Sequence, residues 1–368
     1  MLMALTFLSL AVGPKAQAVS PPPDGGYPGG NTAEGQNALL SLTSGTFNTA
    51  VGFLSLRSDT EGQFNTAVGA GALLANEGRP TTNLGIENTA VGAGALLSNT
   101  TASFNTADGA FALLSNTTGG GNTANGFQAL HNNTQGGGNA ALGINALLTN
   151  STGFSNTAVG NTALGSNTTG SGNTALGFGA GGAVTTASNV ICIGAEGNNV
   201  DNSCFVGNIF DATNSNGVAV LVNSNGRLGT ATSSRRFKGE IKPMQRSSEV
   251  VFALKPVTFR YKKGIDPQGI AQFGLVAEDV EKVNPDLVVR DKEGKPYSVR
   301  YDQVNAMLLN EFLKEHEAFI EEQHKVEKLE ATVASLVATV KEQSAQIQKV
   351  SAHVELSEAA PLTAVKGP

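Results

Sequence analysis

The sequence has no tryptophan and only two cysteines, and aromatic residues make up 6% of its 368 residues. So few large side chains argue against one large packed core. Cys192 and Cys204 form no Cys-x-x-Cys pair, and two cysteines cannot complete a zinc site by themselves. We therefore predict no metal and no cofactor. The cysteines are expected to be small buried residues or, in an exported protein, a disulfide.

Charge is scarce in the first two thirds of the chain. Residues 1–232 hold 4 Lys or Arg and 10 Asp or Glu, whereas residues 233–368 hold 20 of each kind. This break in composition predicts a domain boundary near residue 230. Because neither part has an excess of basic residues, binding to nucleic acid through phosphate contacts is not expected.

Long apolar runs are also missing. Leu5 to Val12 form a short apolar stretch, too short to span a bilayer as a helix. It is followed by Ala16-Gln17-Ala18, which fits the small-x-small cleavage pattern. The positively charged region that usually begins an export signal is missing. We predict an export signal at 1–18, a linker at 19–30 and no transmembrane segment. The protein is therefore expected to be secreted or displayed on a bacterial surface, or to be a fibre derived from a virion.

The chain does contain a seventeen-residue repeat between residues 31 and 182. The consensus sequence of a unit is Asn-Thr-Ala-Val-Gly, two variable residues, Ala-Leu-Leu, then Asn-Thr-Thr-Gly. One unit is longer by six residues around Arg79 to Glu87. The units begin at Asn31, Asn48, Asn65, Asn88, Asn105, Asn122, Asn139, Asn156 and Asn173. A fixed period of this length indicates stacked repeats.

One unit cannot bury a core alone, since it carries only a few small apolar residues such as Ala90, Val91, Ala95 and Leu96. Stacking would join them into one apolar column. Turns rich in Gly, Asn and Thr come too often for long helices. The Thr-Ala-Val and Ala-Leu-Leu runs could be strands or a helical turn. We predict a mainly β region, a β-solenoid or a β-roll shared between three chains. The first Asn of each unit is expected to form a stacked hydrogen-bond ladder.

The Asn-Thr-Ala-Val-Gly and Ala-Leu-Gly phrases resemble the head repeats of trimeric bacterial adhesins and the shafts of phage tail fibres. The simplest interpretation is a passive shaft. A cell-surface or glycan ligand bound along it is one alternative, and ice bound by a threonine ladder is another. The repeats hold no cluster of Asp, Glu or His suited to glycoside hydrolysis or metal catalysis.

Residues 183–232 are predicted to form a strand-rich neck. Val190 to Ile193 and Val218 to Val222 are short β-branched runs. Asn225-Gly226 indicates a tight turn close to the break in composition.

Ser233 and Lys238 stand at that break, five residues apart. A serine needs a base to become a nucleophile, and a lysine can be that base when burial favours its uncharged form. The spacing alone does not establish catalysis, because a Ser-Ser-Arg-Arg stretch is typical of a solvated linker.

The following residues resemble a known family over about 230–320. Ser233-Ser234-Arg235-Arg236-Phe237-Lys238 matches its Ser-Asp-x-Arg-x-Lys opening. The later sequence motifs of the family are matched, in the same order, by Leu254 to Tyr261, Gly274 to Val280, Asn284 to Val288 and Val299 to Tyr301. The segment is similar to the intramolecular chaperone domain of phage endosialidases, tail spikes and neck appendages, which is also found in the membrane-bound myelin regulatory factor.

The resemblance implies a role for each matching residue. Ser233 would attack the carbonyl of Thr232, and Lys238 would be its general base, so that the chain cuts itself once between Thr232 and Ser233. Ser234 stands where the family has Asp, which leaves Ser234 as an alternative nucleophile. Glu278-Asp279 replaces the family's Gln-Glu, and we assign neither carboxylate a role. No activity on other substrates is expected.

A heptad pattern follows Tyr301. Apolar residues recur every seven positions at Phe312, Phe319, Val326, Val333, Val340, Ile347 and Val354, with Leu329, Leu336 and Val350 between them. Polar residues interrupt the second row at Glu315, Glu322 and Gln343. The pattern predicts a self-associating coiled coil, with a single amphipathic helix packed on its own domain as the alternative. A homotrimer is implied by the family resemblance and not by the heptads.

The predicted architecture is a mainly β repeat shaft at 31–182, a β-rich neck at 183–232, a small α+β chaperone domain at 233–310, a coiled coil at 311–355 and a disordered tail at 356–368. The predicted function is that of a trimeric fibre or adhesin-like structural protein. Its C-terminal domain would chaperone assembly and then be released by autoproteolysis. The alternative is an uncleaved secreted adhesin whose C-terminal domain only trimerises.

Overall fold

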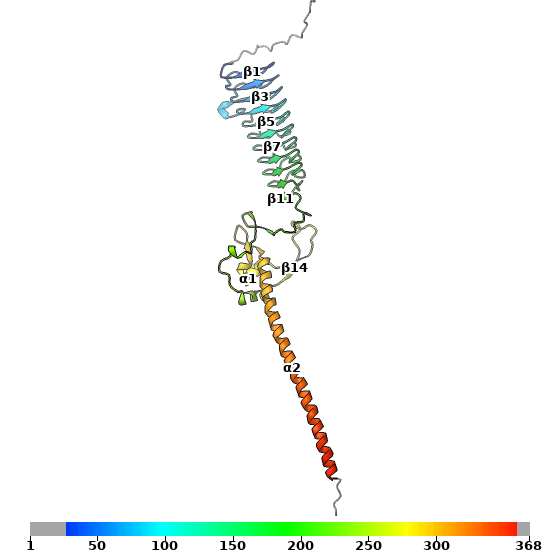
Figure 1. Cartoon of the computed structure of the whole chain (residues 1–368). Helices are drawn as coiled ribbons and strands as arrows, with labels where there is room; N and C mark the ends of the chain where they lie inside the picture. Colours follow the sequence, from blue (N-terminus) through cyan, green and yellow to red (C-terminus); the bar gives the residue numbers. More distant parts are fainter. Residues whose placement is uncertain (1–26, 359–368) are drawn as a thin grey trace, which may run out of the picture. The chain divides into compact units, whose positions relative to one another are not determined.

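The computed structural model describes residues 27–358, so the predicted export signal and the end of the predicted tail, 359–368, lie outside the described residues. The chain divides into two compact units between Asn214 and Ser215. The first is built from short parallel strands, and the second from small hairpins, short helices and one long helix (Figure 1).

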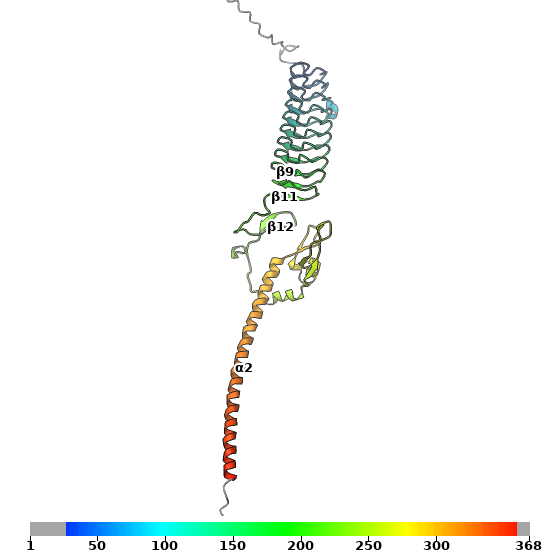
Figure 2. The ribbon, with the colours of Figure 1, turned by 90° about the vertical axis from the view of Figure 1, so that its right-hand side faces the viewer.

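The first unit is a β-solenoid of about ten turns, in which each coil contributes one three-residue strand. The strands pair in parallel in chain order, and Figure 2 shows the coils stacked on one another. They are β1 (Thr32–Glu34), β2 (Thr49–Val51), β3 (Thr66–Val68), β4 (Thr89–Val91), β5 (Thr106–Asp108), β6 (Thr123–Asn125), β7 (Ala140–Leu142), β8 (Thr157–Val159), β9 (Thr174–Leu176), β10 (Ile191–Ile193) and β11 (Cys204–Val206). The predicted solenoid and its seventeen-residue period are confirmed.

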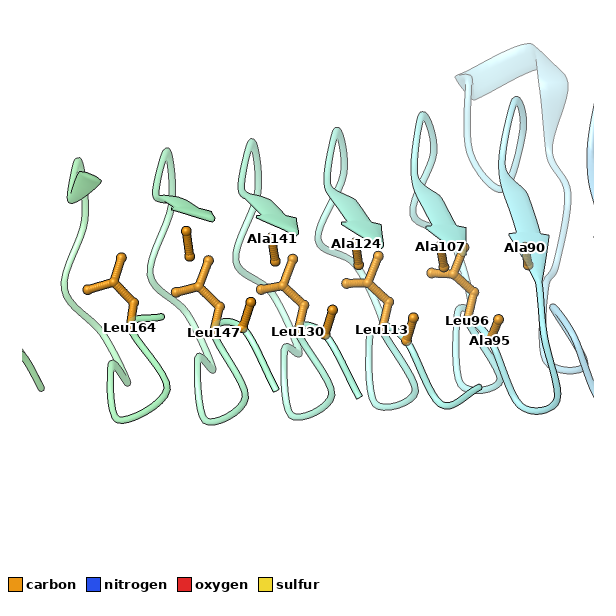
Figure 3. Packing of buried hydrophobic residues seen from close by; sticks show 14 of the residues in the cluster. Ala90, Ala95, Leu96, Ala107, Leu113, Ala124, Leu130, Ala141, Leu147 and Leu164 are labelled. Carbon is orange, nitrogen blue, oxygen red and sulfur yellow. The ribbon is translucent and has the colours of Figure 1, made fainter. Parts of the chain in front are cut away.

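The core of the solenoid consists of columns of small apolar side chains. The middle residue of each strand points inward, and the register sets Ala90 on Ala107 and Ala107 on Ala124. A second column is formed by the ninth residue of the coils, a Leu that follows Ala in most of them, such as Leu113 and Leu130, which are fully buried. Figure 3 shows the two columns facing each other inside the coils. The stack therefore forms the continuous apolar column that one unit cannot form alone.

The Ala-Leu-Leu run is a turn in which the first Leu has a left-handed backbone. Leu96 and Leu113 both have φ of 51°, a conformation that is costly for a residue with a Cβ atom. Complete burial of the Leu side chain, worth about 2 kcal/mol, offsets that cost. Tertiary packing thus selects a local conformation that the propensity of leucine does not predict.

The Gly that closes each strand is required by the stacking distance. Gly109 has φ of +141°, and a Cβ atom placed on it would lie 2.5 Å from the carbonyl oxygen of Gly126 in the next coil. No side chain fits there without moving the neighbouring coil, which explains why every unit has Gly four residues after its first Asn.

The first Asn of each unit forms the predicted ladder through the buried interior. In the middle of the stack, Asn105 Oδ1 accepts the backbone N–H of Asn122 at 2.9 Å, and Asn122 Oδ1 accepts that of Asn139 at 3.0 Å. The side-chain amide of Asn122 donates to the carbonyl oxygen of Gly136 at 2.8 Å. These bonds satisfy backbone groups that the turns leave unpaired inside the coil.

The Asn of the Asn-Thr-Thr-Gly phrase forms a second ladder that the sequence did not predict. Asn116 Nδ2 donates to Asn99 Oδ1 at 2.9 Å, and Asn133 Nδ2 donates to Asn116 Oδ1 at 2.8 Å. The ladder continues through Asn150 and Asn167. At its N-terminal end an acid, Asp59, occupies the same place in its coil.

One coil departs from the repeat. The six additional residues lie in a loop that contains the 3-10 helix η1 (Pro80–Thr82) and projects from the side of the stack (Figure 1). The parallel stack also continues through β10 and β11, within the segment that the sequence assigned to the neck. Cys192 points inward from β10, whereas Cys204 is exposed on β11, and both cysteines are free.

The second unit is small and thinly packed. Its strands form three antiparallel pairs: β12 (Val220–Val222) with β13 (Leu228–Thr230), β14 (Val257–Phe259) with β15 (Gln272–Gly274), and β16 (Val288–Arg290) with β17 (Pro296–Val299). Its helices are η2 (Arg235–Phe237), η3 (Gln245–Ala253), α1 (Ala277–Val283), η4 (Pro285–Leu287) and α2 (Tyr301–Glu358). The buried core among the described residues consists of Val280, Leu287, Val288, Val299 and Val304. So small a core leaves much of the unit's apolar surface exposed.

The helix α2 is 58 residues long. Its first turns contact the small core through Val304 and Met307, and every residue from Glu315 to Leu356 is exposed. No helix within 27–358 is long and apolar enough to cross a membrane.

Candidate functional site

A β-hairpin leads into the candidate cleavage site. Between β12 and β13, Asn223 Oδ1 accepts the backbone N–H groups of Asn225 and Arg227, each at 3.0 Å. Gly226 has φ of +79°, a conformation that suits glycine in a tight turn. The turn predicted at Asn225-Gly226 is therefore present, and it lies just upstream of Ser233.

Thr232 and Ser233 lie in an irregular segment between β13 and η2. Ser234 has an extended backbone, and so does Lys238 at the other end of η2. The backbone N–H of Phe237 donates to the Ser234 carbonyl at 3.0 Å, and that of Lys238 donates to the Arg235 carbonyl at 3.1 Å. A single 3-10 turn therefore separates the predicted nucleophile from the predicted base.

The structure places Ser233, Ser234 and Lys238 at the surface of the single chain. Within residues 27–358, the hydroxyl of Ser233 makes no hydrogen bond with the amine of Lys238. A lysine acts as a base when its surroundings exclude water, and one copy of the chain does not provide such surroundings. The geometry also does not distinguish Ser233 from Ser234 as the nucleophile.

A second contact between serine and lysine lies in the same unit, and sequence reasoning missed it. Ser248, on η3, donates its hydroxyl hydrogen to Glu311 of α2 and accepts from Asn310 Nδ2 at 2.6 Å. Lys314 Nζ lies 2.7 Å from Glu311 Oε1 and 3.5 Å from Ser248 Oγ. The spacing of Glu311 and Lys314 on one helix predicts their ion pair, but nothing in the sequence connects them to Ser248.

This network is structural and not a second catalytic dyad. The hydrogen bond from Lys314, and then that from Ser248, hold the pKa of Glu311 below its usual value. An ammonium paired with a carboxylate cannot accept a proton from serine, and Ser248 is fully buried. The network fastens η3 to the first turns of α2.

The described part of the chain contains no group of three or more His, Cys, Asp or Glu side chains that could hold a metal ion.

Comparison with known families supports the resemblance noted in the sequence. Residues 233–289 match the family model described as chaperone of endosialidase, a peptidase family known for self-cleavage. The match begins at Ser233 and includes the phrases up to Asn284 to Val288, but it ends before Val299 to Tyr301. Searches of curated proteins and of solved structures gave no match. The chain therefore joins a β-solenoid, consistent with tail-fibre-like repeats, to a segment that matches the endosialidase chaperone family.

Proposed function

We propose that the chain is the subunit of an exported homotrimeric fibre, whose C-terminal domain guides assembly and then cuts itself off. The observation that carries this proposal is the position of the family match, which begins at Ser233 directly after the hairpin. The solenoid would be the mature shaft, secreted or displayed on a cell surface or carried by a virion.

The proposed reaction is a single acyl transfer followed by hydrolysis. Ser233 Oγ attacks the carbonyl carbon of Thr232, and its proton passes to the uncharged amine of Lys238. The bond between that carbon and the Ser233 nitrogen breaks, and the nitrogen takes the proton back from Lys238. Water then hydrolyses the ester, which leaves a carboxylate on Thr232 and a free amine on Ser233.

Assembly would supply the surroundings that the single chain lacks. The exposed apolar positions of α2 include Phe319, Val333 and Ile347, which are 59%, 56% and 65% exposed. Such a row on a helix of 58 residues favours pairing with copies of itself. Packing of three copies would cover Ser233 and Lys238 together, so that cleavage would follow correct assembly.

Parallel pairing between consecutive coils forms slowly, because a whole coil must close before its strand can pair, and this favours a chaperone for the shaft. A helix that joins the chains first would raise the local concentration of the solenoid segments. After cleavage the shaft could not easily unfold and assemble again, so its stability would be kinetic.

Intact masses of Ser233→Ala, Ser234→Ala and Lys238→Ala beside the unsubstituted chain test the proposal. We expect Ser233→Ala and Lys238→Ala to remain uncut, and Ser234→Ala to be cut between Thr232 and Ser233. Cleavage in Ser233→Ala but not in Ser234→Ala would move the nucleophile to Ser234. A trimer of unsubstituted chains that stays uncut would favour the alternative, a secreted adhesin whose C-terminal domain only trimerises.

A further inference from the structure

An apolar edge runs along the solenoid where each strand ends. It is formed by the fourth and sixth residues of the coils, on either side of the Gly that closes the strand, and we call it the apolar ridge. Its fourth residues include Val91, Leu142 and Leu176, which are 38%, 49% and 50% exposed. Its sixth residues include Phe127 and Phe178, which are 44% and 83% exposed. Exposed apolar surface that extends over many coils marks an interaction site.

The apolar ridge differs from the other exposed residues of the solenoid. The outward residue at the start of each strand is polar in most coils, as at Thr89 and Thr106. A row of exposed aromatic residues at the last position of the coils, which includes Phe47, does not extend beyond Phe104, since Gly121, Gly138, Ser155 and Gly172 take its place. Of these rows, only the ridge stays apolar as far as the last strand, β11.

The binding partner that fits this ridge is a second copy of the chain. Neighbouring strands lie about 4.8 Å apart, so the ridge presents apolar side chains at that interval. A parallel copy has the same interval along its whole length, whereas most partners would match only a few coils. The exposed heptad positions of α2 provide a separate reason for copies to lie parallel.

Two polar residues at the fourth position of the ridge would set the alignment of the copies, whereas Asn161 and Asn208 are polar at the sixth position. The fourth position is apolar in every coil from Val51 to Val206 except at Asp108 and Asn125, which are consecutive. Asn125 Nδ2 donates to Asp108 Oδ2 at 3.5 Å. In aligned copies the Asp108 carboxylates face one another, and the amide of Asn125 can also donate to a neighbouring Asp108, which offsets their repulsion. A slip of two coils would place Asp108 against an apolar residue of the neighbouring copy, which is costly.

We propose that the apolar ridge is the surface along which the shafts of the homotrimer pack in register. This inference rests on the proposed trimer and adds the surface that holds the shafts together. Ridge residues are not needed to fold a coil, because their side chains are exposed in the single chain.

Disulfide formation between copies tests the inference. Leu142→Cys on the ridge and Thr152→Cys, an exposed residue in the same coil, are each placed in the full chain carrying Cys192→Ala, Cys204→Ser and Ser233→Ala. Under mild oxidation we expect most Leu142→Cys chains to become covalent dimers, and at least fivefold fewer Thr152→Cys chains. Equal yields, or no link at Leu142→Cys in a trimeric sample, would overturn the inference.

Sedimentation of the same samples separates this inference from the proposed function. A monomeric full chain would overturn both, whereas a trimer without the Leu142→Cys link would overturn the ridge alone. Register is tested by mixing chains carrying Leu142→Cys with chains carrying Val159→Cys, one coil further on. We expect links within one level to exceed mixed links, and equal amounts would contradict the aligned packing.

Discussion

Buried side-chain amides hold the coils of the solenoid together at the scale of single residues. The ladder at the first Asn of each unit could be predicted from the period, because a polar residue repeated at one interior position needs a repeated partner. The second ladder, at Asn116 and its equivalents, was missed because an Asn-Thr-Thr-Gly phrase is also typical of a turn. The contact of Ser248 with Glu311 could not be predicted, since it depends on how two distant segments pack.

Replacing a member of the second ladder tests its contribution to stability. Asn116→Ala removes the donor to Asn99 and the acceptor for Asn133, and it leaves both with an unmade hydrogen bond in a dry interior. We expect the free energy of unfolding of the shaft to fall by about 2 to 4 kcal/mol. Denaturant unfolding followed by circular dichroism measures the loss. The exposed Asn132→Ala is the control, and an equal effect there would contradict the assignment.

Asp59 makes the stability of the shaft depend on pH. Its Oδ1 accepts the N–H groups of Gly62 and Gly78, but its buried Oδ2 has no hydrogen-bond partner within the described residues. Burial raises the pKa of Asp59 from 3.8 to about 6. The folded chain therefore binds a proton between about pH 4 and 6 that the unfolded chain has released, and stability falls as the pH rises through that window.

The Asp59→Asn variant isolates this effect. It should remove a loss of stability on the order of 3 kcal/mol between about pH 4 and 7, and it should make the shaft more stable at neutral pH. Thermal unfolding at about pH 4, 5, 6 and 7 is the measurement, with Glu61→Gln as the control for an exposed carboxylate. An unchanged pH profile in Asp59→Asn would show that Asp59 is not the group responsible.

At the scale of elements, the sequence predicts different aspects of the solenoid coil and of the long helix α2. The period and its Gly positions predict the solenoid, since spacing alone requires stacked coils. The left-handed backbone at Leu113 could not be predicted, because burial overrides the local preference. The heptads predict the helix α2, but the number of copies that pack along it depends on contacts that one chain does not contain.

Charges placed on the heptad seam test the role of α2. Val333→Asp with Leu336→Asp puts carboxylates at both apolar positions of one heptad, which should prevent the copies from packing. We expect the full chain to sediment as a monomer and to lose at least tenfold of its cleavage. Ser335→Asp, at an outward position of the same turn, should leave both unchanged. A trimer in the seam variant would contradict the prediction.

At the scale of the whole molecule, cleavage is expected to depend on assembly. The sequence could predict Ser233 and Lys238 as candidates through the family resemblance, and the family match supports the boundary at Ser233. It could not predict their surroundings, because both residues are exposed in the single chain. The site is therefore expected to be completed only when copies of the chain come together.

The dependence of cleavage on assembly can be measured as the intact mass of the chain in each oligomeric fraction, separated by size soon after synthesis. We expect uncut chains in the monomer fraction. In the trimer fraction we expect two fragments, one ending at Thr232 and one beginning at Ser233. Cleaved monomers, or trimers that remain uncut, would contradict the claim that assembly brings Ser233 and Lys238 into a working site.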